Sequence, residues 1–151
     1  MKRFFTSLLL TLAFTLVLAP SAKAETAQWI ARQANLSYSS FRSFYSCDYA
    51  EDRAEAFLKQ LGAKNVRTRC SGGLPDSQFV NVRATFEAAV PAARGSQASF
   101  QRVTLSARES CDFNEQLIRQ ILPFFTVRNV QSRSSCWDSQ GRVGFTLDVL
   151  K

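Results

Sequence analysis

Two stretches of the chain repeat apolar residues at the three- and four-residue spacing of an amphipathic helix. The first stripe contains Ala54, Phe57, Leu58 and Leu61, and the second contains Leu117, Ile118, Ile121, Leu122 and Phe125. Each stripe predicts a helix whose apolar side packs on a sheet. Gly62 is the expected end of the first helix, and Pro123 is expected to end or distort the second.

Each predicted helix starts with an aspartate that is followed three residues later by a glutamate. The pairs are Asp48 with Glu51 and Asp112 with Glu115. This spacing predicts a capping box, in which the aspartate accepts from early helix N–H groups and the glutamate reaches back. Each helix is then expected to begin one residue after its aspartate. A catalytic acid–base pair is the alternative interpretation, and recurrence at both helix starts favours capping.

Alternation of polar and apolar residues predicts strands before and after both helices. The alternation is clearest in 79–86, where Phe79, Asn81, Arg83 and Thr85 share one face, opposite Val80, Val82, Ala84 and Phe86. The strands expected in the first half are Leu36–Tyr45, Asn65–Cys70 and Phe79–Phe86. Those expected in the second half are Phe100–Ala107, Asn129–Cys136 and Val143–Leu150.

The segment that begins at Ser46 recurs 64 residues later. Identical residues at this shift are Ser46 and Ser110, Cys47 and Cys111, Asp48 and Asp112, Glu51 and Glu115, Leu58 and Leu122, Asn65 and Asn129, Val66 and Val130, and Arg69 and Arg133. An internal duplication is the favoured interpretation, with chance similarity as the alternative.

The order of these elements predicts an α+β fold made of two tandem β-α-β-β pseudo-repeats, at about 35–87 and 99–151. Two separate halves would each depend on a very small core. We therefore expect a single domain over 25–151. In it, a largely antiparallel sheet of roughly six strands carries both helices on one face, so that one core buries both stripes.

The start of the chain has the features of a secretory signal peptide. Lys2 and Arg3 precede an apolar run over 4–19, which ends before a small-x-small cleavage signature. A membrane anchor is the alternative, but the run is shorter than the roughly 20 residues that span a bilayer. We expect residues 1–24 to be cleaved after Ala24. The mature protein would be periplasmic or secreted and would have no transmembrane span.

Four cysteines in an exported chain predict two disulfides. Zinc binding is the alternative, but no close C-x-x-C pair and no histidine is present. Four cysteines permit three pairings, and duplication favours the local one, Cys47 with Cys70 and Cys111 with Cys136. Each bridge is expected to contribute on the order of 3 kcal/mol by restricting the unfolded chain.

The residue types for catalysis or cofactor binding are scarce in this chain. Without histidine, no serine–histidine or cysteine–histidine couple can form. The Gly72-Gly73 pair lacks the lysine and the strand–turn–helix setting of a phosphate loop. The sequence therefore predicts no enzyme and indicates no catalytic, cofactor-binding or metal-binding residues.

Two surface features are candidates for recognition. Arg42 lies among aromatic residues in Tyr38–Tyr45, and this segment is either a contact edge or a strand whose aromatics fill the core, the interpretation we favour. Arg67 and Arg69 share a strand face, with Arg133 at the matching position of the second copy. They form either a basic stripe for phosphate or carboxylate groups or an ordinary solvated face.

These features favour a non-enzymatic exported module that binds an envelope or extracellular protein. The alternative is arginine-mediated binding of an acidic envelope polymer, a lipid head group or nucleic acid, and a small hydrolase without histidine is a remote third hypothesis. The formal net charge of +7 includes three charges in the signal segment, so it gives weak support to an acidic partner.

Overall fold

The computed structural model describes residues 25–39, 44–74, 79–137 and 140–151. The expected signal peptide and Arg42 lie outside the described residues. The elements in chain order are β1 (Glu25–Ser39), α1 (Cys47–Gln60), β2 (Lys64–Gly72), β3 (Phe79–Pro91), β4 (Ser96–Ala98), β5 (Phe100–Ala107), α2 (Cys111–Ile121), the 3₁₀ helix η1 (Leu122–Phe124), β6 (Val127–Ser134) and β7 (Val143–Leu150).

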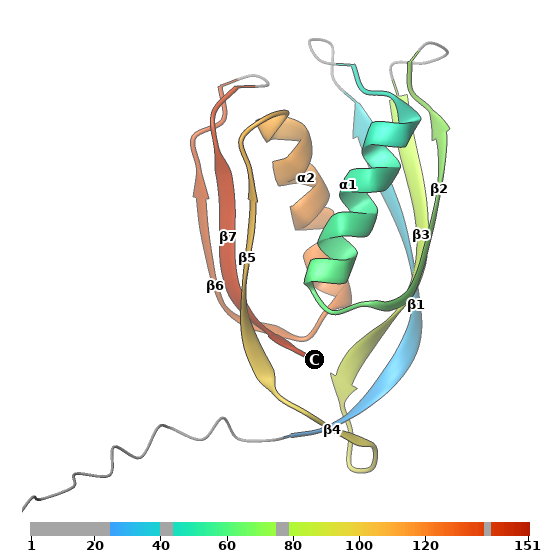
Figure 1. Cartoon of the computed structure of the whole chain (residues 1–151), viewed down its shortest axis with the longest axis vertical. Helices are drawn as coiled ribbons and strands as arrows, with labels where there is room; N and C mark the ends of the chain where they lie inside the picture. The colour runs from blue at the N-terminus through green and yellow to red at the C-terminus, as the bar shows by residue number, and fades with distance from the viewer. Residues whose placement is uncertain (1–24, 40–43, 75–78, 138–139) are drawn as a thin grey trace, which may run out of the picture.

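The described strands form two antiparallel sheets, with α1 and α2 between them (Figure 1). The first sheet has the order β2-β3-β1-β4, and the second has the order β5-β7-β6. The α+β class and the two disulfides are thus confirmed. The single six-stranded sheet with helices on one face is wrong. Helix α2 buries a wider arc than one narrow stripe, so it needs cover on two sides; its buried residues are Cys111, Phe113, Asn114, Leu117, Ile118 and Ile121.

The two sheets meet at a narrow junction at one end of the molecule. There, β1 pairs with β4 from Glu25 to Ala27 only. Ser99 separates β4 from β5 and exchanges two backbone hydrogen bonds with Lys151, each 3.1 Å long. A Cβ on Gly95 would lie 2.1 Å from the Ala27 carbonyl oxygen, so only glycine fits this approach.

Beyond β4, part of the open edge of β1 is covered by a side chain of α2. The amide of Gln120 accepts from the Ser37 backbone N–H and donates to the Ser37 carbonyl oxygen, both at 2.9 Å. Gln120 therefore supplies the hydrogen bonds that a neighbouring strand would make, and this contact ties the second half to the first sheet.

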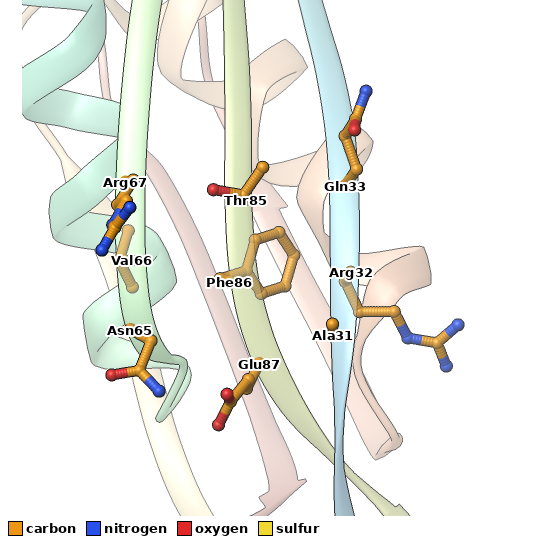
Figure 2. A pocket seen from close by; sticks show the side chains of 9 residues that line it. All are labelled: Ala31, Arg32, Gln33, Asn65, Val66, Arg67, Thr85, Phe86 and Glu87. Carbon is orange, nitrogen blue, oxygen red and sulfur yellow. The ribbon is translucent and has the colours of Figure 1, made fainter.

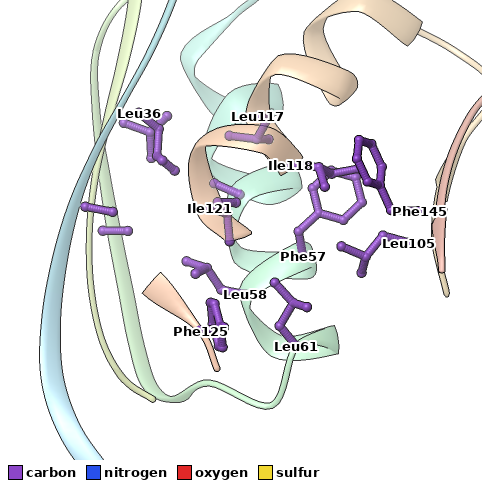
Figure 3. Packing of buried hydrophobic residues seen from close by; sticks show 14 of the residues in the cluster. Leu36, Phe57, Leu58, Leu61, Leu105, Leu117, Ile118, Ile121, Phe125 and Phe145 are labelled. Atoms are coloured by element: carbon purple, nitrogen blue, oxygen red, sulfur yellow. The ribbon is translucent and has the colours of Figure 1, made fainter. Parts of the chain in front are cut away.

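One hydrophobic cluster joins residues of both helices and both sheets. Figure 3 shows Phe57 pointing from α1 toward Leu105 and Phe145 of the second sheet, beside Ile118 of α2. All four side chains are at most 2 % exposed. Because Phe57 belongs to the first half and its neighbours to the second, neither half encloses this part of the core alone.

The helix starts differ from the expected capping boxes. Helix α1 begins at Cys47, and the Ser46 hydroxyl accepts from the Tyr49 N–H at 3.3 Å. Helix α2 begins at Cys111 after Ser110, whose φ is 50° and whose side chain makes no capping bond. The aspartates are the second residues of the helices, two positions after the N-caps Ser46 and Ser110, so both capping-box predictions are wrong.

The glutamates instead bind the neighbouring strand. Glu51 accepts from the Cys70 backbone N–H, and Glu115 accepts from the Ser134 hydroxyl. The hydrogen bond from Ser134 is the main cause that lowers the pKa of Glu115, with help from Arg119 and against the effect of burial. Both carboxylates thus tie a helix to the strand beside it.

Several strand bounds also differ from the expectation. Strand β1 runs over Glu25–Ser39 instead of Leu36–Tyr45, and β3 continues to Pro91. The register of the two strands extends from Ser39 opposite Phe79 to Ala27 opposite Pro91. The extra length lies in alanine-containing segments whose weak alternation gives little strand signal.

Candidate functional site

The outer face of the first sheet gathers arginine and amide side chains from three neighbouring strands. Arg69 of β2 lies directly opposite Arg83 of β3, which lies opposite Asn35 of β1. Two residues further along each strand, on the same face, Arg67 lies opposite Thr85. We call this surface the arginine face; its members are Gln33, Asn35, Arg67, Arg69, Asn81, Arg83 and Thr85, all exposed.

Strand alternation produces this surface. Between the exposed residues of β3, Val82 and Ala84 are at most 2 % exposed and pack in the core. Their burial fixes Arg83 and Thr85 on the other side of the sheet, because successive side chains of a strand point to opposite faces. The apolar core therefore determines where the charges are displayed.

The arginine face carries positive charge that no ion pair among the described residues neutralises, and the Glu87 carboxylate lines the same depression as Arg67 without a salt bridge to it. Within the described part of the chain, Arg67, Arg69 and Arg83 form no ion pair and no side-chain hydrogen bond. Like charges placed directly opposite each other across a sheet are unfavourable. Repulsion between Arg69 and Arg83 therefore destabilises the folded state, and an anionic ligand bound between them would remove this repulsion.

The outer face of the second sheet is different, because its arginines surround a carboxylate. Asp148 lies 3.1 Å from the Nε of Arg102 and 3.8 Å from that of Arg128, and it accepts from the Asn129 amide at 2.7 Å. The hydrogen bond from Asn129, followed by Arg102 and Arg128, lowers the pKa of Asp148 against the opposing effect of desolvation. These charges are satisfied within the protein.

Two shallow depressions hollow the arginine face. One has a volume of about 620 Å³ and is lined in part by Gln33, Arg67 and Thr85. Figure 2 shows these three side chains on neighbouring strands, whereas Arg32 points beyond the edge of β1. The other has a volume of about 360 Å³ and includes Arg69 and Arg83. Open depressions of this kind suit groups that lie along the surface better than a small molecule that needs enclosure.

The structure brings together only part of the residue set indicated by the sequence. Arg67 and Arg69 share the arginine face, but Arg133 lies on β6 of the second sheet, opposite Gly144. A continuous stripe through all three is therefore not formed. Sequence reasoning missed Arg83 as a site residue. The alternation in Phe79–Phe86 predicted on which face of its strand Arg83 lies. Only the pairing register shows that Arg83 lies opposite Arg69.

The aromatic segment before α1 serves mainly the core. Tyr38 is 5 % exposed, and its ring centroid lies 5.0 Å from that of Phe113. The Tyr45 ring also contacts that of Phe113, in a tilted arrangement with 4.7 Å between the centroids, and both tyrosine hydroxyls donate to Asp112. The core interpretation is right for these two tyrosines, whereas Phe44 is 40 % exposed.

The disulfides join each helix start to the hairpin that follows it. Cys47 is bonded to Cys70 and Cys111 to Cys136, with a Cα–Cα distance of 5.4 Å in both pairs. Two disulfides are compatible with an exported protein. No described helix is long and apolar enough to cross a membrane. In the same described residues, no cluster of three or more histidine, cysteine, aspartate and glutamate side chains is arranged to hold a metal ion.

Comparison of the chain with protein-family models, with curated proteins and with solved structures gives no match. Function is therefore inferred from the chain's own geometry. Among the described residues, the arginine face is a candidate for binding anionic groups, because guanidinium groups pair with carboxylates and phosphates.

Proposed function

We propose that this chain is an exported, non-enzymatic binding protein whose arginine face recognises an acidic envelope polymer. The observation that carries this proposal is the grouping of Arg67, Arg69 and Arg83 without a carboxylate partner among the described residues. Guanidinium groups form paired hydrogen bonds with carboxylate and phosphate groups, whose charge they match. Export rests on the signal sequence expected over 1–24 and is supported by the two disulfides.

The spacing of the arginines favours a ligand with repeated charges. Residues two apart on a strand are about 7 Å apart, and directly opposite residues on paired strands are about 5 Å apart at their Cβ atoms. Arg67 and Arg69 have the first relationship, and Arg69 and Arg83 the second. A polymer with an anionic group in each unit can satisfy several such positions at once without the large contact area that a protein complex needs.

The test is the salt dependence of binding to inorganic polyphosphate, measured with the mature, oxidised protein. Affinity should fall steeply as salt rises, because each phosphate contact releases a counterion. Arg67→Gln, Arg69→Gln and Arg83→Gln should each weaken binding and lower the slope of log K against log salt by about 1. Arg133→Gln is the matched control and should leave both unchanged. Equal loss in the control, or affinity independent of salt, would contradict the proposal.

Recognition of an envelope or extracellular protein is the second candidate function, and a different observation favours it. Strand β6 is an edge strand that pairs only with β7 among the described strands, and its residues from Arg128 to Ser134 are all exposed. Such an edge can accept a strand from a partner through backbone hydrogen bonds. A complex with one defined protein that survives high salt and is lost in Val130→Lys, but not in Arg67→Gln, would support this candidate over the first.

We also propose that the two halves of the chain arose by duplication of a β-α-β-β unit. The support comes from matching details at the 64-residue shift. Each half has its bridge between helix and hairpin, and each has a register shift at an asparagine with positive φ, Asn65 or Asn129. Distant relatives of the chain should show the same shift between about 35–87 and 99–151, and halves that align at no common shift would contradict a duplication.

A further inference from the structure

One edge of the first sheet is open along much of strand β1. Strand β4 covers this edge only from Glu25 to Ala27, and the Gln120 side chain covers it again at Ser37. Between these two contacts, no other described strand pairs with β1 on this side. We call residues 29–35 the open edge.

The pairing register gives the direction of the backbone groups in the open edge. Ser37 directs its N–H and C=O away from β3, toward Gln120. The register of β1 with β3 runs without a shift from Ala27 to Ser39, and alternate residues of an antiparallel strand direct these groups to the same side. The residues of the open edge whose N–H and C=O groups point away from β3 are therefore Trp29, Ala31, Gln33 and Asn35. In the described part of the chain, no strand or side chain is bonded to these groups, so a further strand can pair with them.

The open edge lacks the features that hinder pairing at other edges of the molecule. Strands β2 and β6 are each bent by a register shift at an asparagine, Asn65 or Asn129. The open edge has an unbroken register and contains no proline and no lysine. Strand β5 also has an unbroken register, but its arginine, Arg102, is paired with Asp148. An extended partner can therefore pair along the whole of 29–35.

Arg32 lies in the middle of the open edge and is its one charged residue. It belongs to the helix-facing side of β1, opposite Phe86, and its side chain points beyond the edge of the strand (Figure 2). Its Nε is buried without a hydrogen-bond partner, and its guanidinium forms no ion pair among the described residues. An unsatisfied buried donor destabilises the folded protein. A turn of the guanidinium toward a carboxylate at the edge would satisfy this donor through paired hydrogen bonds.

The carboxylates on the elements around β1 do not supply this partner. Glu87 of β3 projects from the outer face of the sheet (Figure 2). On α2, the carboxylates of Asp112 and Glu115 already accept hydrogen bonds from other side chains. Neither β4 nor η1 contains an acidic residue. Glu25 lies at the junction with β4, about 23 Å along the strand from Arg32. The complement of Arg32 is therefore an acidic group from another molecule.

We propose that the open edge binds an extended segment of another protein by strand addition, with a glutamate or aspartate of that segment paired to Arg32. Ile30 and Ala34 flank Arg32 on the same face, so apolar residues two positions before and after the acid would lie beside them. A second copy of this chain fits less well, because antiparallel pairing of two open edges centred on Arg32 brings like charges together. This site uses the backbone and the helix-facing side of β1, so it depends neither on the arginine face nor on β6.

The test measures the binding of a labelled peptide to the mature, oxidised protein. The peptide is threonine–valine–threonine–glutamate–threonine–valine–threonine, and its match has glutamine in place of glutamate. Arg32→Gln should weaken binding of the glutamate peptide about tenfold, because a charge-assisted hydrogen bond is lost, and should hardly change binding of the glutamine peptide. Arg133→Gln on the edge strand β6 is the matched control, and it should leave binding of both peptides unchanged. Arg67→Gln should do the same, which separates this test from that of the arginine face.

Hydrogen exchange with the glutamate peptide gives a second readout, which locates the contact. The amides of Ala31 and Gln33 should gain protection, whereas those of Ile30 and Arg32 face β3 and should change little. Ala31→Pro removes an outward N–H without removing a bond to β3, so it should weaken binding of both peptides. If this variant fails to fold, Arg32→Gln and the exchange pattern still decide the question.

Four results would overturn the proposal. They are no binding of the glutamate peptide, equal weakening of both peptides in Arg32→Gln, protection gained in β6 instead of β1, and protection of Ala31 and Gln33 that rises with protein concentration without peptide. The third result would place strand addition at the other edge. The fourth would mean that a second copy of the chain occupies the open edge.

Discussion

Asn65 and Asn129 adopt the same left-handed backbone conformation, with φ of 51° and 53°. Each lies at the point where an edge strand shifts its register, between Lys64 and Arg67 in β2 and between Arg128 and Gln131 in β6. Asparagine tolerates this conformation better than other residues with a Cβ, apart from aspartate, and glycine tolerates it best. The two edge strands are therefore bent by the same local device.

This relationship predicts different costs for different substitutions. Asn65→Ala should lower the free energy of unfolding by about 1 kcal/mol, whereas Asn65→Gly should be close to neutral. Asn129→Gly should be more costly than Asn65→Gly, because Asn129 also donates to Asp148 at 2.7 Å. Urea denaturation of the oxidised variants measures all three. Equal stability of Asn65→Ala and Asn65→Gly would show that the backbone conformation is not the reason for asparagine.

The arginine face predicts a trade between stability and binding. Arg69 and Arg83 lie directly opposite each other, and like charges in this position destabilise a sheet by a few tenths to about 1 kcal/mol. Arg83→Gln should therefore raise the free energy of unfolding at low salt while it weakens polyphosphate binding. Arg133 lies opposite Gly144, so Arg133→Gln should change neither the free energy of unfolding nor polyphosphate binding. A less stable Arg83→Gln variant would indicate that the guanidinium makes a stabilising contact instead.

The second sheet predicts a loss of stability in acid. Hydrogen bonding from Asn129 and the nearby Arg102 and Arg128 lower the pKa of Asp148 from its ordinary value of 3.8. A carboxyl group with a lowered folded-state pKa stabilises the protein above that ordinary value, and the contribution is lost as pH falls through the folded-state pKa. Asp148→Asn should therefore be less stable at neutral pH and should lose less stability below about pH 4.

Thermal unfolding of the wild type and Asp148→Asn between pH 2 and pH 7 measures this difference. Glu55→Gln is the control, because Glu55 forms an exposed pair with Lys59 within α1 and should contribute less than 1 kcal/mol. Parallel pH curves for the wild type and Asp148→Asn would contradict the role given to Asp148.

The disulfides predict similar losses when either one is removed. The bridged residues are 23 and 25 positions apart, so removal of either bridge should cost about 3 kcal/mol by the chain-entropy model. Paired alanine substitutions are preferable, because Cys111 is fully buried and a serine there would bury a hydroxyl. Denaturation of both double variants measures the cost, and a Cys47-to-Cys111 peptide in a non-reducing digest would refute the pairing.

Local patterns were sufficient to predict both helices and most of the strands, but they missed most of β1, all of β4 and the assembly of the elements into two sheets. The apolar spacing around Phe57 and Leu117 predicted two helices, and the alternation around Arg83 predicted a strand with one charged face. Whether one sheet or two cover the helices depends on how far apolar contact extends around each helix. Phe113 and Ile118 are buried on different sides of α2, and this shows that two sheets cover the helix. The three- and four-residue spacing of apolar residues in the sequence does not reveal how wide the buried surface is.

The candidate site shows the same limit. Arg67 and Arg69 could be placed together because they lie on one strand, where side chains two apart share a face. Arg83 joins them only through the pairing register of β2 and β3, which local composition does not reveal. Arg133 was included because of sequence similarity alone, and the division into two sheets separates it from the other arginines.

The position of Phe57 predicts that the two halves unfold together. Its side chain comes from the first half, is 1 % exposed and belongs to the cluster that contains Leu105 and Phe145 of the second half. Phe57→Ala should lower the free energy of unfolding by about 3–5 kcal/mol, through lost burial and the cavity left behind. Because the cavity lies between the halves, hydrogen exchange should show equal loss of protection in β3 and β7. Val130→Ala on the surface should change protection in neither strand, and a loss confined to β3 would show that the halves are independent units.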